Sequence, residues 1–204
     1  VFNSLPRSNL LQAPNTAIAL MPVKGQRPLW GKILQNGEII GIFQLAQAGI
    51  MKNLLHAVIL DRGPLFLLDH NTSENSLAFF SAFNQKFPAR IGRKRRLLPE
   101  HPHSTEFEQA LIESGYRRVK GSKPYKTAWL DCKHSEDLQL TAMRKNWRGA
   151  LKKALNKDIR IKWDTPQNHI KHVLLHYKAD VEMRGYTATD AKTLQRLMRQ
   201  YATM

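Results

Sequence analysis

The sequence predicts an α/β chain of the α+β kind, in which a mixed sheet is flanked by helices. Strand-like segments alternate with helix-like segments along residues 1–131. The pair Asn36-Gly37 also stands between two segments rich in Ile, Leu and Phe. Asn-Gly suits the positive φ angles of a two-residue hairpin turn. Alternation and hairpin together favour a sheet that contains antiparallel strands.

A short N-terminal helix is the first expected element, over residues 9–19. Ser8 can cap it, because a serine hydroxyl accepts a hydrogen bond from a free amide of the first turn. Pro14 interrupts this helix, and Gly25 closes the segment that follows it. The hairpin comes next.

Three strands are expected to follow the first helix. The hairpin pairs Leu29–Leu34 with Glu38–Leu45, and His56–Leu60 forms the next strand. That strand runs into Asp61–Pro64, where an Arg-Gly-Pro sequence favours a turn. The further elements of this part are a helix from Asn71 or Thr72 to Phe87, a basic strand over 89–98, a helix over 103–114 capped by Ser104, and a strand over 127–131.

The pattern changes at Asp131, so we divide the chain into 1–131 and 132–204. The second part reads as helices with one strand, over residues 159–163. Since a lone strand cannot form a sheet, this strand either completes the first sheet or belongs to a domain that continues beyond residue 204. The absence of Met at position 1 favours a fragment. Its expected helices cover 140–157, 167–184 and a segment from Asp190.

Composition points toward anionic partners and a reducing compartment. The 204 residues carry 32 Lys and Arg against 16 Asp and Glu, a formal charge of +16. A hydrophobic content of 42% is normal for a folded chain. The single cysteine, Cys132, excludes an internal disulfide and reads as a packed thiol. No apolar run approaches the roughly 20 residues that span a bilayer. We expect a cytoplasmic protein.

The helix pattern near residues 143–157 is the strongest functional signal. Arg144, Arg148 and Lys152 recur every four residues, with Lys145 and Lys153 beside them. No acidic residue lies between positions 137 and 158, so no i,i+4 partner neutralises these charges. The pattern fits either a solvated basic face or a helix that contacts phosphates or RNA. Apolar residues on another face predict its burial: Leu140, Met143, Trp147, Ala150, Leu151 and Ala154.

A second basic region begins at Arg93-Lys-Arg-Arg96. It could contact nucleic acid, or it could be a charged strand edge that discourages aggregation. Two tyrosines nearby could stack bases. Its other members are Arg117, Arg118, Lys120, Lys123 and Lys126, with Tyr116 and Tyr125.

Taken in order, these motifs resemble those of the Fem-type aminoacyltransferases, the peptidoglycan-bridge enzymes built from two acetyltransferase-like (GNAT-like) domains. The similarity covers nearly the whole chain from Asn9 to Leu197. Its pieces are Leu10-Leu-Gln12, Gly41–Leu45, Arg62-Gly-Pro64, Ser114-Gly-Tyr116, Thr127–Asp131, Trp147-Arg148 with Leu151–Ala154, and Glu182–Gly185.

The resemblance implies a complete first acetyltransferase-like lobe over 1–131 and the helical beginning of a second over 132–204. It implies transfer of an aminoacyl group from a charged tRNA to an amine of a nucleotide- or lipid-linked peptidoglycan precursor, without a cofactor. Relatives of similar sequence use other acyl donors. The reactive part of the second lobe would lie beyond Met204, so the catalytic residues stay unassigned and this chain alone is expected to be inactive.

By the same resemblance, Lys24 matches a lysine that contacts the phosphates of the precursor. Arg62 is a second candidate for that contact. Thr189 stands where the family has a further basic residue, so the sequence departs from the pattern there. The tRNA-binding candidates are Arg144, Lys145, Arg148, Lys152 and Lys153.

Two other functions stay open: a coenzyme-A-dependent N-acyltransferase and a non-catalytic RNA-binding module. Asp69–Glu74 lacks the glycines that would present amides to the coenzyme A pyrophosphate, which disfavours the first. His169, His172 and His176 share a helix, but no Glu or Cys completes a metal-binding motif. We therefore expect no metal site.

Overall fold

The computed structural model describes residues 2–122, 126, 132–157, 159–161 and 166–202. The chain divides into two compact units. The first comprises residues 1–118 and 165–204, and the second comprises residues 119–164. Each unit is described by itself.

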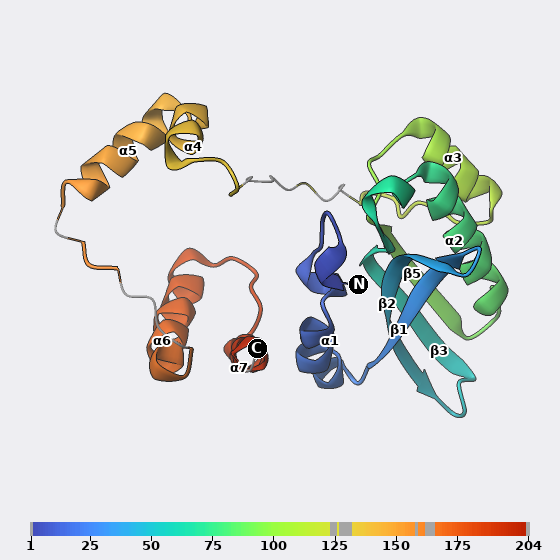
Figure 1. Cartoon of the computed structure of the whole chain (residues 1–204). Coiled ribbons are helices and arrows are strands. Elements are labelled where there is room, and N and C mark those ends of the chain that lie inside the picture. The colour runs from blue at the N-terminus through green and yellow to red at the C-terminus, as the bar shows by residue number, and fades with distance from the viewer. Residues whose placement is uncertain (1, 123–125, 127–131, 158, 162–165, 203–204) are drawn as a thin grey trace. The chain divides into compact units, whose positions relative to one another are not determined.

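A mixed sheet forms the centre of the first unit (Figure 1). Its strand order is β1 (Arg27–Gln35), β2 (Glu38–Ile50), β3 (Leu55–Gly63) and β5 (Arg93–Pro99). The first three strands are antiparallel, whereas β3 and β5 are parallel. The short β4 (Leu65–Phe66) also pairs with β2. The predicted mixed α/β fold is confirmed.

The predicted hairpin is confirmed in detail. Gln35 pairs with Glu38 across the turn, and Asn36 and Gly37 have φ angles of 52° and 86°. Both angles lie in the left-handed region that Asn and Gly tolerate best. The basic strand is also confirmed, but it begins at Arg93 rather than at residue 89.

The N-terminal helix is interrupted at Pro14, as predicted. Its parts are the 3-10 helix η2 (Leu10–Gln12), α1 (Pro14–Leu20) and the 3-10 helix η3 (Pro22–Lys24). The predicted cap was wrong, because the side chain of Asn9, and not Ser8, accepts from the backbone amide of Gln12. Gly25 ends the segment with a φ of 64°.

Two amphipathic helices cover one face of the sheet. They are α2 (Ser73–Lys86), capped by Thr72, and α3 (Thr105–Glu113), capped by Ser104. Both positions agree with the prediction. Aromatic rings of these helices pack against aliphatic side chains of the sheet, and this cluster is the main hydrophobic core. Its buried members are Ile40, Leu45, Val58, Leu60, Phe66, Phe79, Phe80, Phe83, Phe87 and Phe107. Two further 3-10 helices are η1 (Phe2–Ser4) and η4 (Leu68–His70).

Two C-terminal helices complete the first unit. The predicted helices are confirmed as α6 (Pro166–Arg184) and α7 (Ala191–Tyr201). The hydroxyl groups of Thr16 and Tyr201 lie 2.9 Å apart, which joins α7 to α1. These helices therefore group with the sheet and not with residues 132–164. The assignment of 132–204 to a second acetyltransferase-like lobe stays a prediction.

The second unit contains α4 (Glu136–Ala142) and α5 (Lys145–Leu155). The prediction of one continuous helix was wrong, because Met143 and Arg144 between them have extended ψ angles of 145° and 147°. The predicted burial of its apolar face is not found either: no described residue of α5 is buried, and Trp147 is 67% exposed.

Two predicted strands fall largely on residues that the structure leaves undescribed. The strand over 127–131 lies wholly outside the described residues. Of the strand over 159–163, only 159–161 are described, and these three residues are not in a strand. Among the described helices, none is both long enough and apolar enough to cross a bilayer.

Candidate phosphate-binding pocket

An interruption in the β2–β3 ladder builds the candidate site. β3 pairs with β2 from Leu55 to Leu60, and pairing resumes only where β4 meets Gly41 and Ile42. Between these points the chain turns through Arg62, whose φ is 53°, and the cis peptide bond Gly63–Pro64. The backbone of Gln44 therefore lacks a strand partner on this side and needs other hydrogen-bonding groups.

The side chain of Gln12 supplies those groups. Its amide oxygen accepts from the backbone N–H of Gln44 at 2.8 Å. Its amide nitrogen donates to the carbonyl oxygens of Gln44 at 3.1 Å and of Asp61 at 2.8 Å. Gln12 is 2% exposed, so these bonds form away from water. One buried side-chain amide thus bridges β2 and β3 where their backbones separate.

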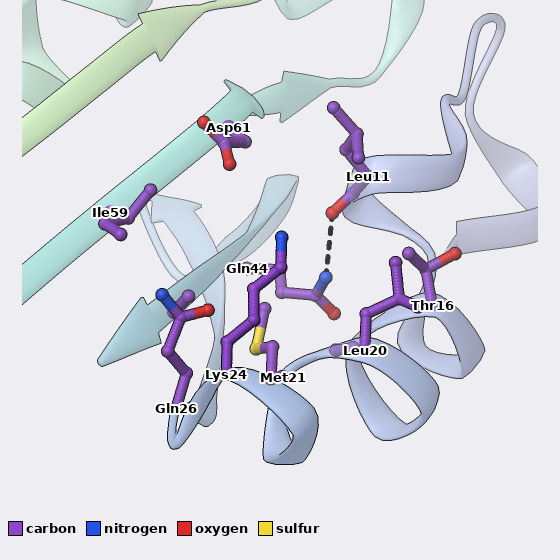
Figure 2. Close-up of a pocket in the computed structure, with 11 residues that line it drawn as sticks. Leu11, Thr16, Leu20, Met21, Lys24, Gln26, Gln44, Ile59 and Asp61 are labelled. Atoms are coloured by element: carbon purple, nitrogen blue, oxygen red, sulfur yellow. Dashed lines mark hydrogen bonds between the residues drawn. The ribbon is translucent and has the colours of Figure 1, made fainter. Parts of the chain in front are cut away.

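The side chain of Gln44 completes the link between η2 and the sheet. Its nitrogen donates to the carbonyl oxygen of Leu11 at 2.8 Å, as the dashed line in Figure 2 marks. Its oxygen accepts from the indole nitrogen of Trp30 at 2.5 Å. Gln44 is also 2% exposed. These bonds fix η2 on the face of the sheet opposite α2, and α1 and η3 follow η2 directly.

A pocket lies between α1, η3 and this face of the sheet (Figure 2). Its volume of about 60 Å³ is that of a few water molecules and suits one phosphate-sized group better than a whole nucleotide. The pocket is lined by Leu11, Thr16, Ala17, Leu20, Met21, Lys24, Gln26, Gln44, Ala46, Ile59 and Asp61.

Lys24 brings a positive charge to this pocket. It lies in the last turn of η3, is exposed, and extends in Figure 2 from η3 toward the strands. Gly25 follows it in the left-handed conformation and turns the chain toward Gln26 on the pocket wall. The ammonium group can therefore move to meet an anion at the mouth of the pocket.

The carboxylate of Asp61 is the acidic group of the pocket. Arg96 neutralises it, because one guanidinium nitrogen lies 2.9 and 2.8 Å from its two oxygens. This pair is partly exposed and contributes little to stability. Because Asp61 is already paired with Arg96, it does not neutralise Lys24, and the pocket keeps a net positive charge.

Arg62 lies in the interruption itself and not on the pocket wall. It is 8% exposed, and its guanidinium donates to both carboxylate oxygens of Glu100 at 2.7 Å. Its backbone carbonyl accepts from the side chain of Asn9 at 2.9 Å. These contacts stabilise the left-handed backbone at Arg62. Its predicted contact with substrate phosphate is untested.

The tRNA-binding candidates lie in the second unit. Arg144 is the N-cap of α5 and not part of the helix, whereas Lys152 and Lys153 lie in its last turn. Arg148 donates to the carbonyl oxygen of Thr141 at 2.8 Å and thereby joins α5 to α4. All five candidates are exposed. Their binding role stays a prediction.

The second basic region is partly structural. The guanidinium of Arg95 lies 5.4 Å from the ring centre of Tyr116 and donates to the side chain of Asn84. The Tyr116 hydroxyl donates to the carbonyl oxygen of Phe80 at 2.9 Å. Burial raises the pKa of Tyr116 to about 12. Tyr116 therefore packs against the core, which leaves it unsuited to stacking on a base.

Thr189 and the three histidines of α6 are the remaining residues that the sequence analysis singled out. Thr189 accepts, through its carbonyl oxygen, the Tyr177 hydroxyl at 2.6 Å. The rings of His172 and His176 contact each other with centres 4.4 Å apart. Among the described residues, no group of three or more His, Cys, Asp or Glu could hold a metal ion.

No protein-family model matches the sequence, and no curated protein matches it. Among solved structures, the crystal structure of FemX is similar, with a TM-score of 0.68 over 98% of this chain at 15% sequence identity. The chain spans about half of that protein, 51% of its length. This likeness confirms the predicted Fem-type fold.

Proposed function

We propose that this protein acts in the transfer of an aminoacyl or acyl group from an activated donor to an amine of a peptidoglycan precursor. The observation that carries the proposal is the position of Lys24 at a small pocket, in a chain with the fold of FemX. Lys24 would hold a phosphate of a nucleotide- or lipid-linked acceptor. That contact would position the acceptor amine for attack on the donor ester.

The pocket fits this role chemically. A phosphate at its mouth would meet the Lys24 ammonium, while Gln26 could add hydrogen bonds from its side-chain amide. The Gln12–Gln44 bridge would keep η3 at a fixed place relative to the sheet. The reaction also needs a proton acceptor and a group that stabilises the carbonyl oxygen, and we assign neither to a residue of this chain.

Calorimetric titration with a nucleotide-linked muramyl-peptide precursor tests the acceptor role. We expect Lys24→Ala to weaken binding by about tenfold or more, since a hydrogen bond to a charged group contributes roughly 1.5–3 kcal/mol. Lys24→Arg should retain much of the affinity. Lys32→Gln, which removes an exposed charge from β1, is the matched control and should change little. Equal affinities for Lys24→Ala and the control would refute the role of Lys24.

The donor in this proposal is a charged tRNA bound through α5. Its exposed cations have no acidic neighbour within the helix, which favours contact with a polyanion. Replacing Arg144, Arg148 and Lys152 together by Gln should flatten the plot of log affinity against log salt by roughly 2–3 units if all three meet phosphates. Lys24→Ala should leave tRNA binding unchanged.

The alternative functions predict different outcomes. A coenzyme-A-dependent acyltransferase would bind coenzyme A in competition with the precursor. At the start of α2, where the pyrophosphate would be expected, the Thr72 hydroxyl already accepts the amide of Asn75 at 3.2 Å. A non-catalytic RNA-binding module would bind tRNA but not the precursor.

A further inference from the structure

The turn from β2 into β3 lies at one end of the sheet (Figure 1), and the residues around it carry exposed aliphatic side chains. We call these residues the aliphatic tip. Four of its members belong to the end of β2, the turn and the start of β3, and Ile91 precedes β5. Its members and their exposed fractions are Ile50 61%, Met51 68%, Leu54 58%, Leu55 49% and Ile91 99%.

The backbone holds this tip in place. Met51, Lys52 and Asn53 have φ angles of 53°, 54° and 68°, in the left-handed region that non-glycine residues rarely adopt. Arg90 fixes the turn, because its guanidinium donates to the carbonyl oxygen of Leu54 at 3.1 Å and to that of Asn53. Such strained turns persist where the surroundings determine them, and they concentrate at functional places.

The segment around Ile91 is joined to the same turn. Gly92 has a φ of 80°, and a Cβ added there would lie 2.4 Å from the carbonyl oxygen of Leu54. Only a glycine allows this close approach of the two backbones. The backbone N–H of His56 donates to the carbonyl oxygen of Gly92 at 2.8 Å. The two segments, each with exposed aliphatic side chains, are therefore held next to each other.

Basic residues lie near the aliphatic tip, and its segments contain no acidic residue. No Asp or Glu occurs in residues 39–60 or in residues 75–99, the segments that carry the tip. Lys52 and Lys94 are exposed beside it. Arg93 anchors its own segment by donating to the carbonyl oxygen of Pro88 at 2.9 Å. Aliphatic side chains within a cationic rim complement an anionic lipid surface, where apolar groups enter the acyl boundary and cations meet lipid phosphates.

We propose that this aliphatic tip docks the protein on an anionic lipid bilayer. The apolar side chains favour a bilayer over RNA, because RNA is met by cations and aromatic rings and offers no place for Ile, Leu and Met. This proposal goes beyond the acyl-transfer function and does not depend on Lys24. A membrane-docked protein would meet lipid-linked acceptors in two dimensions, whereas a nucleotide-linked acceptor needs no such contact.

Cosedimentation with vesicles tests the docking. We expect the chain to bind vesicles of equimolar phosphatidylcholine and phosphatidylglycerol and not to bind vesicles of pure phosphatidylcholine. The bound protein should dissociate as the salt concentration rises. Met51→Ser with Ile91→Ser should weaken binding by at least about tenfold. Lys52→Gln with Lys94→Gln should weaken it about 25-fold, since each cation near the surface contributes about fivefold.

The matched control lies at the opposite end of the same strands. Leu34 is 59% exposed beside the β1–β2 turn, so Leu34→Ser removes a similar apolar side chain without touching the aliphatic tip. Circular dichroism of every variant checks that the fold persists. Ile91→Cys in a Cys132→Ser background, labelled with an environment-sensitive dye, should shift to the blue on vesicles, whereas Leu34→Cys should not.

Several results would overturn the proposal. They are no vesicle binding at low salt, binding that survives Met51→Ser with Ile91→Ser, or equal losses with Leu34→Ser. If the double serine variant instead lost tRNA binding or self-association and kept its vesicle binding, the aliphatic tip would be an RNA or protein contact and the lipid assignment would be wrong.

Discussion

Replacing Gln12 by Ala should destabilise the first unit more than any surface change. The substitution removes three hydrogen bonds, two of them buried and one partly buried, and leaves the amide of Gln44 and the carbonyl of Asp61 without these partners. Each lost bond costs about 1 kcal/mol, and each stranded buried group adds to this, so we expect a loss of roughly 3–5 kcal/mol. Domains are typically stable by about 5–15 kcal/mol, so at the middle of that range the loss is roughly a third to a half of the total.

Urea unfolding followed by far-ultraviolet circular dichroism measures this loss. The midpoint should fall without a change in the slope of free energy against urea. Gln35→Ala, at the exposed end of β1, is the control and should stay within about 0.5 kcal/mol of the parent. Gln12→Glu should also destabilise, because a carboxylate cannot donate to the two carbonyl oxygens.

Hydrogen exchange locates the effect. In Gln12→Ala the amide of Gln44 should exchange much faster, while amides paired between β1 and β2 near the Asn36-Gly37 turn should change less. A loss of stability below about 1 kcal/mol, together with unchanged exchange at Gln44, would refute the idea that Gln12 replaces a missing piece of strand.

Three further predictions concern ionisable groups of the same unit. Burial, together with the charges of Arg93 and Arg90, lowers the pKa of His56 below its usual 6.5. The free energy of unfolding should therefore fall as pH drops below that value. Acid unfolding curves of His56→Gln should lack this dependence. Burial raises the pKa of Tyr116 from 10.0 to about 12. Its contribution to the free energy of unfolding should be complete below pH 10 and disappear as pH rises through 12. Tyr116→Phe should not show this loss at high pH. Glu100→Ala should cost roughly 2–3 kcal/mol in urea unfolding because it strands the buried charge of Arg62, less than for a fully buried pair since Glu100 is 28% exposed.

Local chemistry made most of the fold predictable. Thr72, Ser104 and Asp190 cap their helices with side chains that bond within three residues, so a short stretch of sequence contains the whole interaction. The Asn36-Gly37 turn is local in the same way. At these positions the predictions agree with the structure, whereas the predicted cap of the first helix was one residue off, at Ser8 instead of Asn9.

Long-range contacts were not predictable in the same way. The partners of Gln12 lie 32 and 49 residues away, and Arg62 finds Glu100 after 38 residues. No pattern in the sequence marks those pairs. The break between α4 and α5 contains neither Gly nor Pro. The helical spacing of apolar residues continues across it, so the sequence predicted one helix. Gln12 belongs to the Leu10-Leu-Gln12 motif, but only the structure shows that it bridges β2 and β3.

The binding site of a phosphate-bearing acceptor decides whether Lys24 and its pocket have the proposed role. Backbone amide spectra recorded during titration with a nucleotide-linked muramyl-peptide precursor would locate it. We predict shifts concentrated at Met21, Lys24, Gln26 and Ala46 around the pocket, and their loss in Lys24→Ala. Shifts confined to α5 or to the start of α2, or a pattern that Lys24→Ala leaves intact, would show that the acceptor binds elsewhere.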